Sequence, residues 1–307
     1  MHIIIILGSM VVLHLTQVLS EGINVEEFCA VKCLKPSDIH TICEYKCKED
    51  KDRCKEYKFY PLSRNDRQIL LDQHNMYRNK VASGEDRRGG NEAAKNMKVM
   101  NYDIDIEVTT YCWSKRCIFT HDKCRNLPKY ASAGQNLFLQ SGTAGIDGKN
   151  DKLLNESIKA WYEEIKDTTK ELIESFGSSE AVIGHFTQVV WASTEFVACS
   201  RVTFTDEQEA QFKFKYHLLC NYSPAGNFLG NPVYEFGEGC TAPDEPNDRF
   251  KALCGKLTSI PDKDIVSDDT GGSATATTGK PGENSSTVRF SEFTLVLLMF
   301  LVSFNKM

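Results

Sequence analysis

The chain has 307 residues, 12 cysteines and a formal net charge of −6. This acidic balance gives no reason to expect nucleic acid or an anionic membrane as a partner. All the cysteines lie between Cys29 and Cys254, and their even number predicts oxidised pairs and an extracellular protein. A cytosolic metal-binding protein is the alternative, but the chain has no pair of CxxC knuckles to support it.

The N-terminus is typical of a secretion signal. Residues 3–15 form an almost unbroken apolar run that is too short to span a bilayer. Because Ser20 offers a small residue before Glu21, residues 1–20 are predicted to be a cleaved signal peptide. A buried first helix of the folded domain is the alternative interpretation.

Residues 21–60 are interpreted as a cysteine-rich N-terminal arm. This segment is short and charged, and it holds five cysteines. It has too few large apolar residues to form a core of its own, so we expect disulfides to hold it against the main domain.

Three helices are predicted next, because apolar residues recur three or four positions apart. Ser63 can cap the first helix, and Gly84 can end it. His74 falls on the inner face of the first helix, where a packing role is expected, and Glu164 lies beside the inner face of the third. The predicted helices cover residues 63–84, 103–117 and 154–165.

After the helices, between residues 196 and 222, apolar residues begin to recur at every second position. Residues 212–222 alternate strictly, and residues 196–204 are a second strand candidate. The polar residues 205–209 can join the two as an antiparallel pair, which brings Cys199 and Cys220 close enough to form a disulfide. Helices followed by antiparallel strands predict an α+β layered domain.

The composition changes again after Cys254. Residues 258–287 are rich in Ser, Thr, Gly and Asp and are predicted to be a disordered stalk. Residues 288–307 contain an apolar run that is short for a transmembrane helix, and Asn284 begins three small residues suited to glycolipid attachment. The tail is therefore interpreted as a glycolipid-anchor signal with Asn284 as the attachment site; free secretion and a short membrane span are the alternatives.

Three triplets match the N-glycosylation acceptor and begin at Asn155, Asn221 and Asn284. Asn155 and Asn284 are the predicted glycosylation sites. Such triplets are common by chance, so they support secretion only weakly.

Six sequence blocks occur in an order that resembles one protein family. Gly184–Trp191 (GHFTQVVW) and Leu219–Asn227 (LCNYSPAGN) closely resemble the two signature motifs of the CAP superfamily. That family comprises cysteine-rich secretory proteins, insect venom antigen 5 and plant pathogenesis-related proteins. The N-terminal cysteine spacing is similar to the insect antigen 5 branch, and the resemblance covers about residues 24–240. The other blocks are His74–Arg78 (HNMYR), His121–Arg125 (HDKCR), Gly134–Leu137 (GQNL) and Trp161–Ile165 (WYEEI).

The resemblance implies a three-layer α-β-α sandwich with a central antiparallel sheet, formed by residues 61–240 and followed by a cysteine-stapled extension at residues 241–257. It also implies a large cleft with two histidines and two acidic groups. Carried over to this chain, these positions are His121, His185, Glu164 and, in place of the second acid, Gln135.

Gln135 changes what the cleft is expected to do. A neutral amide is a poor ligand for Zn²⁺ and cannot serve as a general base. We therefore expect His121 and His185 to bind zinc weakly if at all, and we predict no cofactor. The main interpretation is a hydrogen-bonded polar cluster that lines the cleft.

The function that follows is a non-catalytic extracellular binding protein of the antigen 5 type. Its cleft or loops would engage a lipid, a small amphipathic molecule or a protein receptor. The alternative is a hydrolase, a protease or an esterase, that uses the histidines and Glu164 with or without a metal ion. No catalytic residue is assigned under the main interpretation.

The resemblance also implies a disulfide framework. It predicts the pairs Cys29–Cys43, Cys33–Cys124, Cys54–Cys117 and Cys199–Cys220. Four cysteines lie outside the common insect pattern; Cys240–Cys254 is the natural local pair among them, which leaves Cys47–Cys112. Cys47 and Cys54 could exchange roles.

Overall fold

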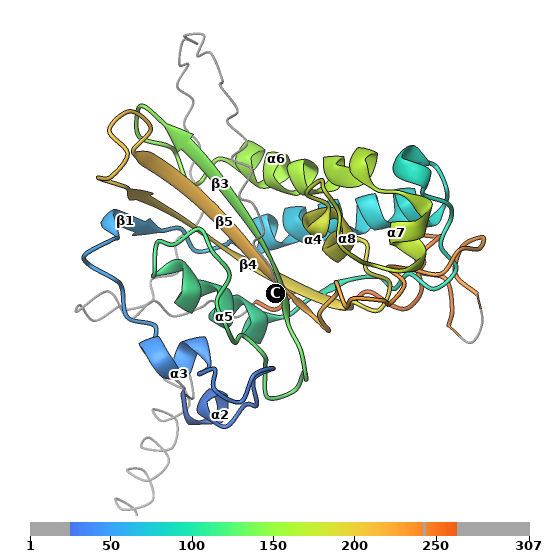
Figure 1. The fold of residues 1–307 in the computed structure, drawn as a ribbon, viewed down its shortest axis with the longest axis horizontal. Coiled ribbons are helices and arrows are strands. Elements are labelled where there is room, and N and C mark those ends of the chain that lie inside the picture. Colours follow the sequence, from blue (N-terminus) through green and yellow to red (C-terminus); the bar gives the residue numbers. More distant parts are fainter. Residues whose placement is uncertain (1–24, 242–243, 263–307) are drawn as a thin grey trace, which may run out of the picture. The chain divides into compact units, whose positions relative to one another are not determined.

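The structure, a computed structural model, describes residues 25–241 and 244–262 and has a five-stranded sheet at its centre. The strands are β1 (Lys55–Phe59), β2 (Asn101–Tyr102), β3 (Gly134–Gly142), β4 (Phe196–Thr205) and β5 (Phe214–Ser223). Four of them lie in the order β1-β4-β5-β3, each antiparallel to its neighbour (Figure 1). The short β2 pairs in parallel with the start of β4.

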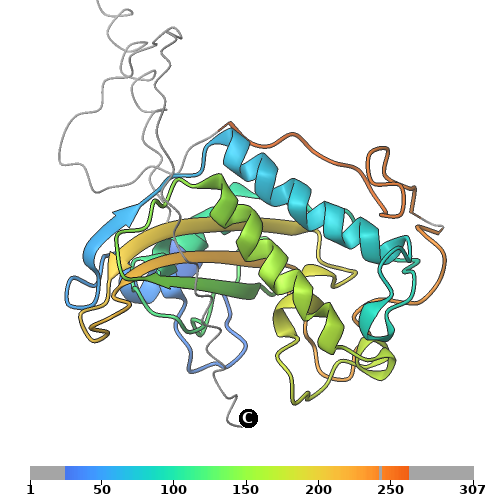
Figure 2. The ribbon, with the colours of Figure 1, turned by 90° about the horizontal axis from the view of Figure 1, so that it is seen from above.

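Helices cover both faces of this sheet. They are α2 (Val25–Cys29), α3 (Thr41–Tyr45), α4 (Arg64–Ala82), α5 (Ile104–Ser114), α6 (Asp151–Tyr162), α7 (Lys170–Glu174), α8 (Gly184–Val189) and the 3₁₀ turns η1 (Arg88–Gly90) and η2 (Glu163–Asp167). Figure 2 shows α4 and α6 side by side on one face. The opposite face is covered by α5, against which α3 of the N-terminal arm packs. The predicted three-layer α-β-α sandwich is confirmed.

The first predicted helix is α4, and its start depends on Ser63. The Ser63 side chain accepts a hydrogen bond from the Asp66 amide at 3.1 Å, and the Asp66 carboxylate accepts one from the Ser63 amide at 2.8 Å. This reciprocal capping box satisfies two amides that the helix itself leaves unpaired. The helix ends at Ala82, two residues before Gly84, whose φ of +71° favours glycine.

The other two predicted helices end differently from the expectation. α5 stops at Ser114 rather than at Cys117, whose φ of 49° lies in the left-handed region. α6 begins at Asp151 because the side chain of Asn150 accepts from the Lys152 amide at 3.0 Å. It then tightens into η2, so Glu164 lies on a 3₁₀ turn rather than on the α-helix.

The predicted hairpin is present as β4 and β5. Cys199 and Cys220 lie opposite each other in its register and form a disulfide. Sequence periodicity did not reveal β3 or β1. The first half of β3 contains the consecutive polar residues Gln135 and Asn136. Apolar and polar residues therefore do not alternate clearly along this strand.

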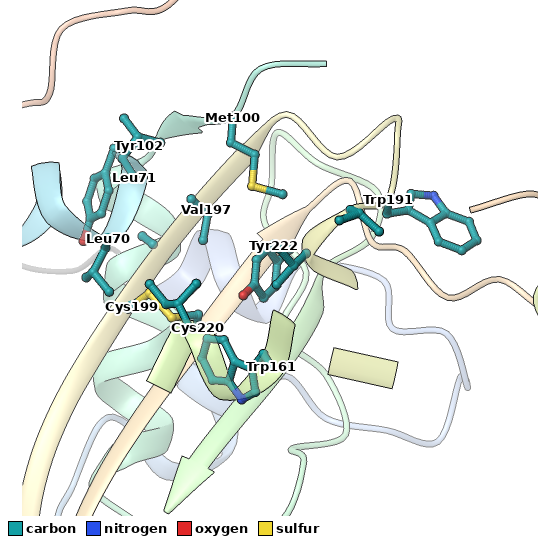
Figure 3. Packing of buried hydrophobic residues seen from close by; sticks show 14 of the residues in the cluster. Leu70, Leu71, Met100, Tyr102, Trp161, Trp191, Val197, Cys199, Cys220 and Tyr222 are labelled. Carbon is teal, nitrogen blue, oxygen red and sulfur yellow. A yellow bond between two sulfur atoms is a disulfide. The ribbon is translucent and has the colours of Figure 1, made fainter. Parts of the chain in front are cut away.

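The main core lies between the sheet and the layer that contains α4, α6 and α8. Figure 3 shows the Cys199–Cys220 disulfide beside Leu70, Trp161 and Tyr222 in this core. All five of these side chains are almost fully buried. Fully burying one large apolar side chain stabilises the fold by about 1.5–3 kcal/mol, so this region fixes α4 and α6 relative to the strands.

Every cysteine is paired. Four of the six disulfides are the pairs that the family resemblance implies, and the other two are the local pair Cys240–Cys254 and the remaining pair Cys47–Cys112. Three of them join the arm to α5 and to the segment that follows it, each across a long stretch of chain. Such cross-links typically contribute about 2–4 kcal/mol each. The pairs are Cys29–Cys43, Cys33–Cys124, Cys47–Cys112, Cys54–Cys117, Cys199–Cys220 and Cys240–Cys254.

The C-terminal extension packs along α4 and continues beyond the expected boundary at Leu257. Its residues contact successive turns of α4, from Arg249 on Asp72 at 2.7 Å to Asp262 on Arg64 at 2.7 Å. Ile260, which was assigned to the stalk, is only 5% exposed. The remaining stalk and the tail lie outside the described residues, as do the signal peptide and Asn284.

Candidate binding site

His185 is held in place by Glu164, which reaches it from η2. One carboxylate oxygen of Glu164 lies 2.6 Å from Nδ1 of His185, and the other accepts from the backbone amides of His185 at 3.0 Å and Phe186 at 3.1 Å. The carboxylate therefore serves as the N-terminal cap of α8 and orients the imidazole at the same time. Because a carboxylate only accepts hydrogen bonds, Nδ1 of His185 carries a proton and donates, which leaves Nε2 with its lone pair when the ring is neutral.

Two further contacts fix α8 and the ring of His185. The indole of Trp161 stacks on this imidazole with the ring centres 6.2 Å apart. Arg78 is fully buried and donates to the carbonyl oxygens of Val189 and Trp191, both at 2.8 Å. Burial lowers the pKa of Arg78 to about 9. This guanidinium thus satisfies carbonyls at the C-terminal end of α8 that the helix leaves unpaired.

His121 is held by Gln135 in a different way. The side-chain nitrogen of Gln135 donates to the carboxylate of Asp122 at 3.1 Å and to the side-chain oxygen of Asn221 at 3.0 Å. Asp122 can only accept, so the amide nitrogen must face it and the amide oxygen must face His121. That oxygen lies 2.8 Å from Nδ1 of His121, which therefore carries the proton.

The two histidines belong to one site. His121 is partly exposed to solvent. Desolvation by the surrounding protein is the largest effect that lowers the pKa of its imidazole, and the positive charge of Arg125 is the second. Its hydrogen bond with Gln135 raises that pKa, and the nearby His185 lowers it further. His121 is neutral at pH 7, with Nε2 available as an acceptor.

Asp122 connects the site to the N-terminal arm. Besides the amide of Gln135, its carboxylate accepts hydrogen bonds from the Thr41 hydroxyl of α3 and from Arg125. In the sequence Asp122 is part of the HDKCR block, and no local pattern assigns it a role. Its place directly after His121 was the available signal, but its partners come from distant parts of the chain.

His74 lies in the core, apart from the solvent-facing imidazoles. It is fully buried; its Nδ1 donates to the Leu70 carbonyl at 2.7 Å, and its Nε2 accepts from the Tyr222 hydroxyl at 2.9 Å. Burial lowers the pKa of His74 to about 4, so the ring is neutral. Asn136 extends this chain of hydrogen bonds by donating to Tyr222 at 3.3 Å and to the His185 carbonyl at 3.0 Å. His74 therefore supports the site from behind.

The donor set fits a metal ion poorly. Within residues 25–241 and 244–262, no group of three or more His, Cys, Asp or Glu side chains is placed to hold one. The atoms that remain are Nε2 of His121 and Nε2 of His185, because Glu164 is engaged by three donors. Catalytic zinc sites usually have three protein ligands, so this pair falls one short.

The glycosylation triplets differ in their surroundings. Asn155 is half-exposed on α6, where its side chain donates to the Asp151 carbonyl at 3.0 Å. Asn221 is fully buried in β5 and donates to Thr109 at 2.9 Å. A glycan at Asn221 is incompatible with this fold, and Asn284 lies outside the described residues.

Comparisons with known proteins agree with this architecture. The model of the cysteine-rich secretory protein (CAP) family matches residues 71–222. Venom allergen 3 of Solenopsis invicta is 36% identical over 209 residues, which cover 66% of this chain and 86% of that protein. Venom allergen 5 of Vespula maculifrons is 34% identical over 212 residues, which cover 68% of this chain and 98% of that protein.

Solved structures give the same result. The crystal structure of NaASP2 with Zn²⁺ has a TM-score of 0.53 and 32% identity, covering 63% of this chain and 97% of that one. The structure of BmVAL-1 has a TM-score of 0.53 at 21% identity, covering 65% of this chain and 97% of that one, and supports the fold alone. The chain therefore belongs to the CAP family of cysteine-rich secretory proteins, with insect venom allergens 3 and 5 among its relatives.

Proposed function

We propose that this CAP protein is a non-catalytic extracellular binding protein whose site engages a lipid, a small amphipathic molecule or a protein receptor. The observation that carries the proposal is the environment of Gln135. Its amide occupies the position of the second acid and is locked between Asp122, Asn221 and His121.

The groups of the site favour binding over hydrolysis. A hydrolytic reaction requires a base and an acid, or a metal ion that activates water. Glu164 is engaged as the cap of α8, and Gln135 cannot take up a proton. All cysteines form disulfides, so no thiol nucleophile is available. The accessible Nε2 atoms of His121 and His185 remain as polar groups that can orient a ligand.

The His185–Glu164 pair is the observation that favours the alternative hydrolase. A carboxylate that orients an imidazole through Nδ1 also occurs in catalytic triads. Such a pair could activate a water molecule at Nε2, but no hydroxyl or thiol is hydrogen-bonded to His185 in the part of the chain that the structure describes. The arrangement therefore supports binding better than turnover.

An extracellular location is supported by the six disulfides and by the likeness to venom allergens. In residues 25–241 and 244–262, no helix is long and apolar enough to cross a bilayer. We include in the proposal that the C-terminal tail is replaced by a glycolipid anchor at Asn284, which would hold the domain at the surface of the cell that made it.

Native mass spectrometry tests the proposal on the full chain expressed in insect cells and collected without detergent, either from the medium or after release by phosphatidylinositol-specific phospholipase C. We expect a bound small molecule that is released on denaturation. We also expect the same background rate with ester and peptide substrates for the wild type and for His185→Ala. Turnover that disappears in both His185→Ala and Glu164→Gln would overturn the binding function in favour of the hydrolase.

A further inference from the structure

The two edge strands of the sheet differ in how they are protected. β1 is five residues long and carries Lys55, Glu56 and Lys58, and its pairing with β4 is interrupted by a register shift. Short length, charged side chains and irregular pairing are features that keep an edge strand from pairing with another chain. β3, at the opposite edge, is nine residues long and pairs with β5 without a shift (Figure 1). Its sequence, residues 134–142, contains no charged residue and no proline.

The outer backbone groups of β3 can be assigned from its ladder. In an antiparallel sheet, consecutive residues direct their N–H and C=O groups alternately toward one side of the strand and the other. The Leu137 carbonyl faces outward, because it accepts a hydrogen bond from Nε1 of Trp161 at 3.1 Å. The backbone groups of Leu139 and Ser141 therefore also face outward, and they have no partner in the part of the chain that the structure describes. Residues 138–142 are all partly exposed, so these groups are open to another chain.

A second copy of β3 is complementary to this edge. If Leu139 pairs in antiparallel with Ser141 of the second copy, two-fold symmetry creates the reciprocal pair, and the outward groups of both residues are satisfied. Gln140 then lies on the symmetry axis opposite its own copy, where two neutral amides can hydrogen-bond to each other. Phe138 comes opposite Gly142, which has no side chain to obstruct the ring.

The charges near the strand also fit a second copy. Like charges placed directly opposite each other destabilise paired strands, and symmetry brings identical residues together at the axis. Here every facing pair is uncharged. Lys215, which donates to the Ser141 hydroxyl at 2.9 Å, is compensated by an ion pair with Glu209 at 2.6 Å. Self-pairing of β3 therefore meets no like-charge repulsion within the paired segment.

We propose that the chain forms a two-fold symmetric dimer in which β3 pairs in antiparallel with β3 of a second copy, joining two sheets into one. Because a single strand of each chain makes the contact, the interface belongs to the small, transient class. The dimer therefore forms and dissociates with protein concentration. This inference concerns assembly, and it does not depend on what the histidine site binds.

Sedimentation velocity over a dilution series tests the proposal on the full chain, collected as for native mass spectrometry. We expect a reversible equilibrium between monomer and dimer. Ser141→Pro should weaken the dimer about tenfold or more, which is about 1.4 kcal/mol, because proline removes the outward N–H but no hydrogen bond to β5. Ser141→Ala is the matched control: it loses the same hydroxyl contact with Lys215 but keeps the N–H, so the dimer should change by less than about twofold.

Charges placed on the symmetry axis give an independent test. Gln140→Lys and Gln140→Glu should each be monomeric, because each places like charges opposite each other, and an equal mixture of the two should restore a dimer. Hydrogen exchange at high protein concentration should protect the amides of Leu139 and Ser141. A chain that stays monomeric at every concentration, a dimer that Ser141→Pro leaves unchanged, or a mixture that does not associate would each overturn the inference.

Discussion

Gln135 holds His121 in a single tautomer, because its amide oxygen lies 2.8 Å from Nδ1 of that imidazole. The orientation of the amide is set on its other side, where the nitrogen donates to two acceptors, Asp122 and Asn221. The Gln135 side chain is thus an integrated part of a hydrogen-bond network.

Gln135→Glu should therefore lower the stability of the protein and also change the pKa of His121. It removes the donor that satisfies Asp122 and Asn221 and places two carboxylates next to each other. Leaving buried acceptors unpaired costs about 1–3 kcal/mol. The added negative charge should raise the pKa of His121. Urea unfolding measures the loss of stability, and NMR titration measures the pKa of His121.

Gln140→Glu is the control, because Gln140 is half-exposed on the same strand. If Gln135→Glu left the pKa of His121 unchanged, the hydrogen-bond network around Gln135 would be contradicted.

Two buried histidines, His217 and His74, allow the cost of burying an unpaired imidazole to be compared with that of burying a hydrogen-bonded one. His217 is 1% exposed, and neither of its ring nitrogens has a hydrogen-bond partner among the described residues. His74 is equally buried, but both of its nitrogens are paired. His217→Leu should stabilise the protein by about 1–3 kcal/mol, whereas His74→Leu should destabilise it by a similar amount, because it leaves Tyr222 and Leu70 unpaired. Denaturant unfolding of both variants decides the point, and equal losses would refute it.

The stability of the protein should fall in acid. Burial lowers the pKa of His74 and the pKa of His217 to about 4, well below the value of 6.5 for a free imidazole. The unfolded chain therefore binds protons first as the pH falls, and native stability present above pH 6.5 is lost between pH 6.5 and 4. Each residue can contribute on the order of 3 kcal/mol, since one pKa unit corresponds to about 1.4 kcal/mol. Unfolding curves at pH 7.5 and 4.5 measure the loss, which should be smaller in His217→Leu. A flat profile would show that neither ring is buried neutral.

Zinc is expected to bind weakly to this chain, because His121 and His185 supply only two protein ligands. The related NaASP2 was crystallised with Zn²⁺, so the comparison is direct. Calorimetry at pH 7.5 should give no nanomolar affinity, and any binding should weaken on acidification because protonated imidazole cannot ligate. Nanomolar binding that is unchanged in Gln135→Glu would contradict the reasoning.

The proposed anchor predicts a specific release. Phosphatidylinositol-specific phospholipase C should free the protein from intact insect cells that express the full chain, because it cleaves the glycolipid and not the protein. Replacing Asn284, Ser285 and Ser286 with bulky residues should abolish that release. Protein that stays with the cells, or that is found in the medium with Met307 intact, would reject the anchor.

Much of the fold could be predicted from local patterns. The Ser63 cap, the helical spacing along α4 and the alternation along β5 each depend on residues a few positions apart. Such short-range preferences act wherever the segment is placed, so they can be read from the sequence alone. Four disulfide pairs followed from the resemblance to the insect family, and the predicted hairpin independently supported one of them, Cys199–Cys220. Cys240–Cys254 followed from proximity in the sequence, which left Cys47–Cys112.

The sequence, through its resemblance to the family, named His121, Gln135, Glu164 and His185 as candidate site residues, but only the tertiary structure decided what these side chains contact. Gln135 meets Asn221 across 86 residues, and Glu164 reaches His185 across 21. The amide orientation, the histidine tautomers and the use of Glu164 as a helix cap depend on donors and acceptors that distant strands and turns supply. Burial lowers the pKa of His121 and the pKa of His74, because the desolvation that lowers them exists only once the chain is packed.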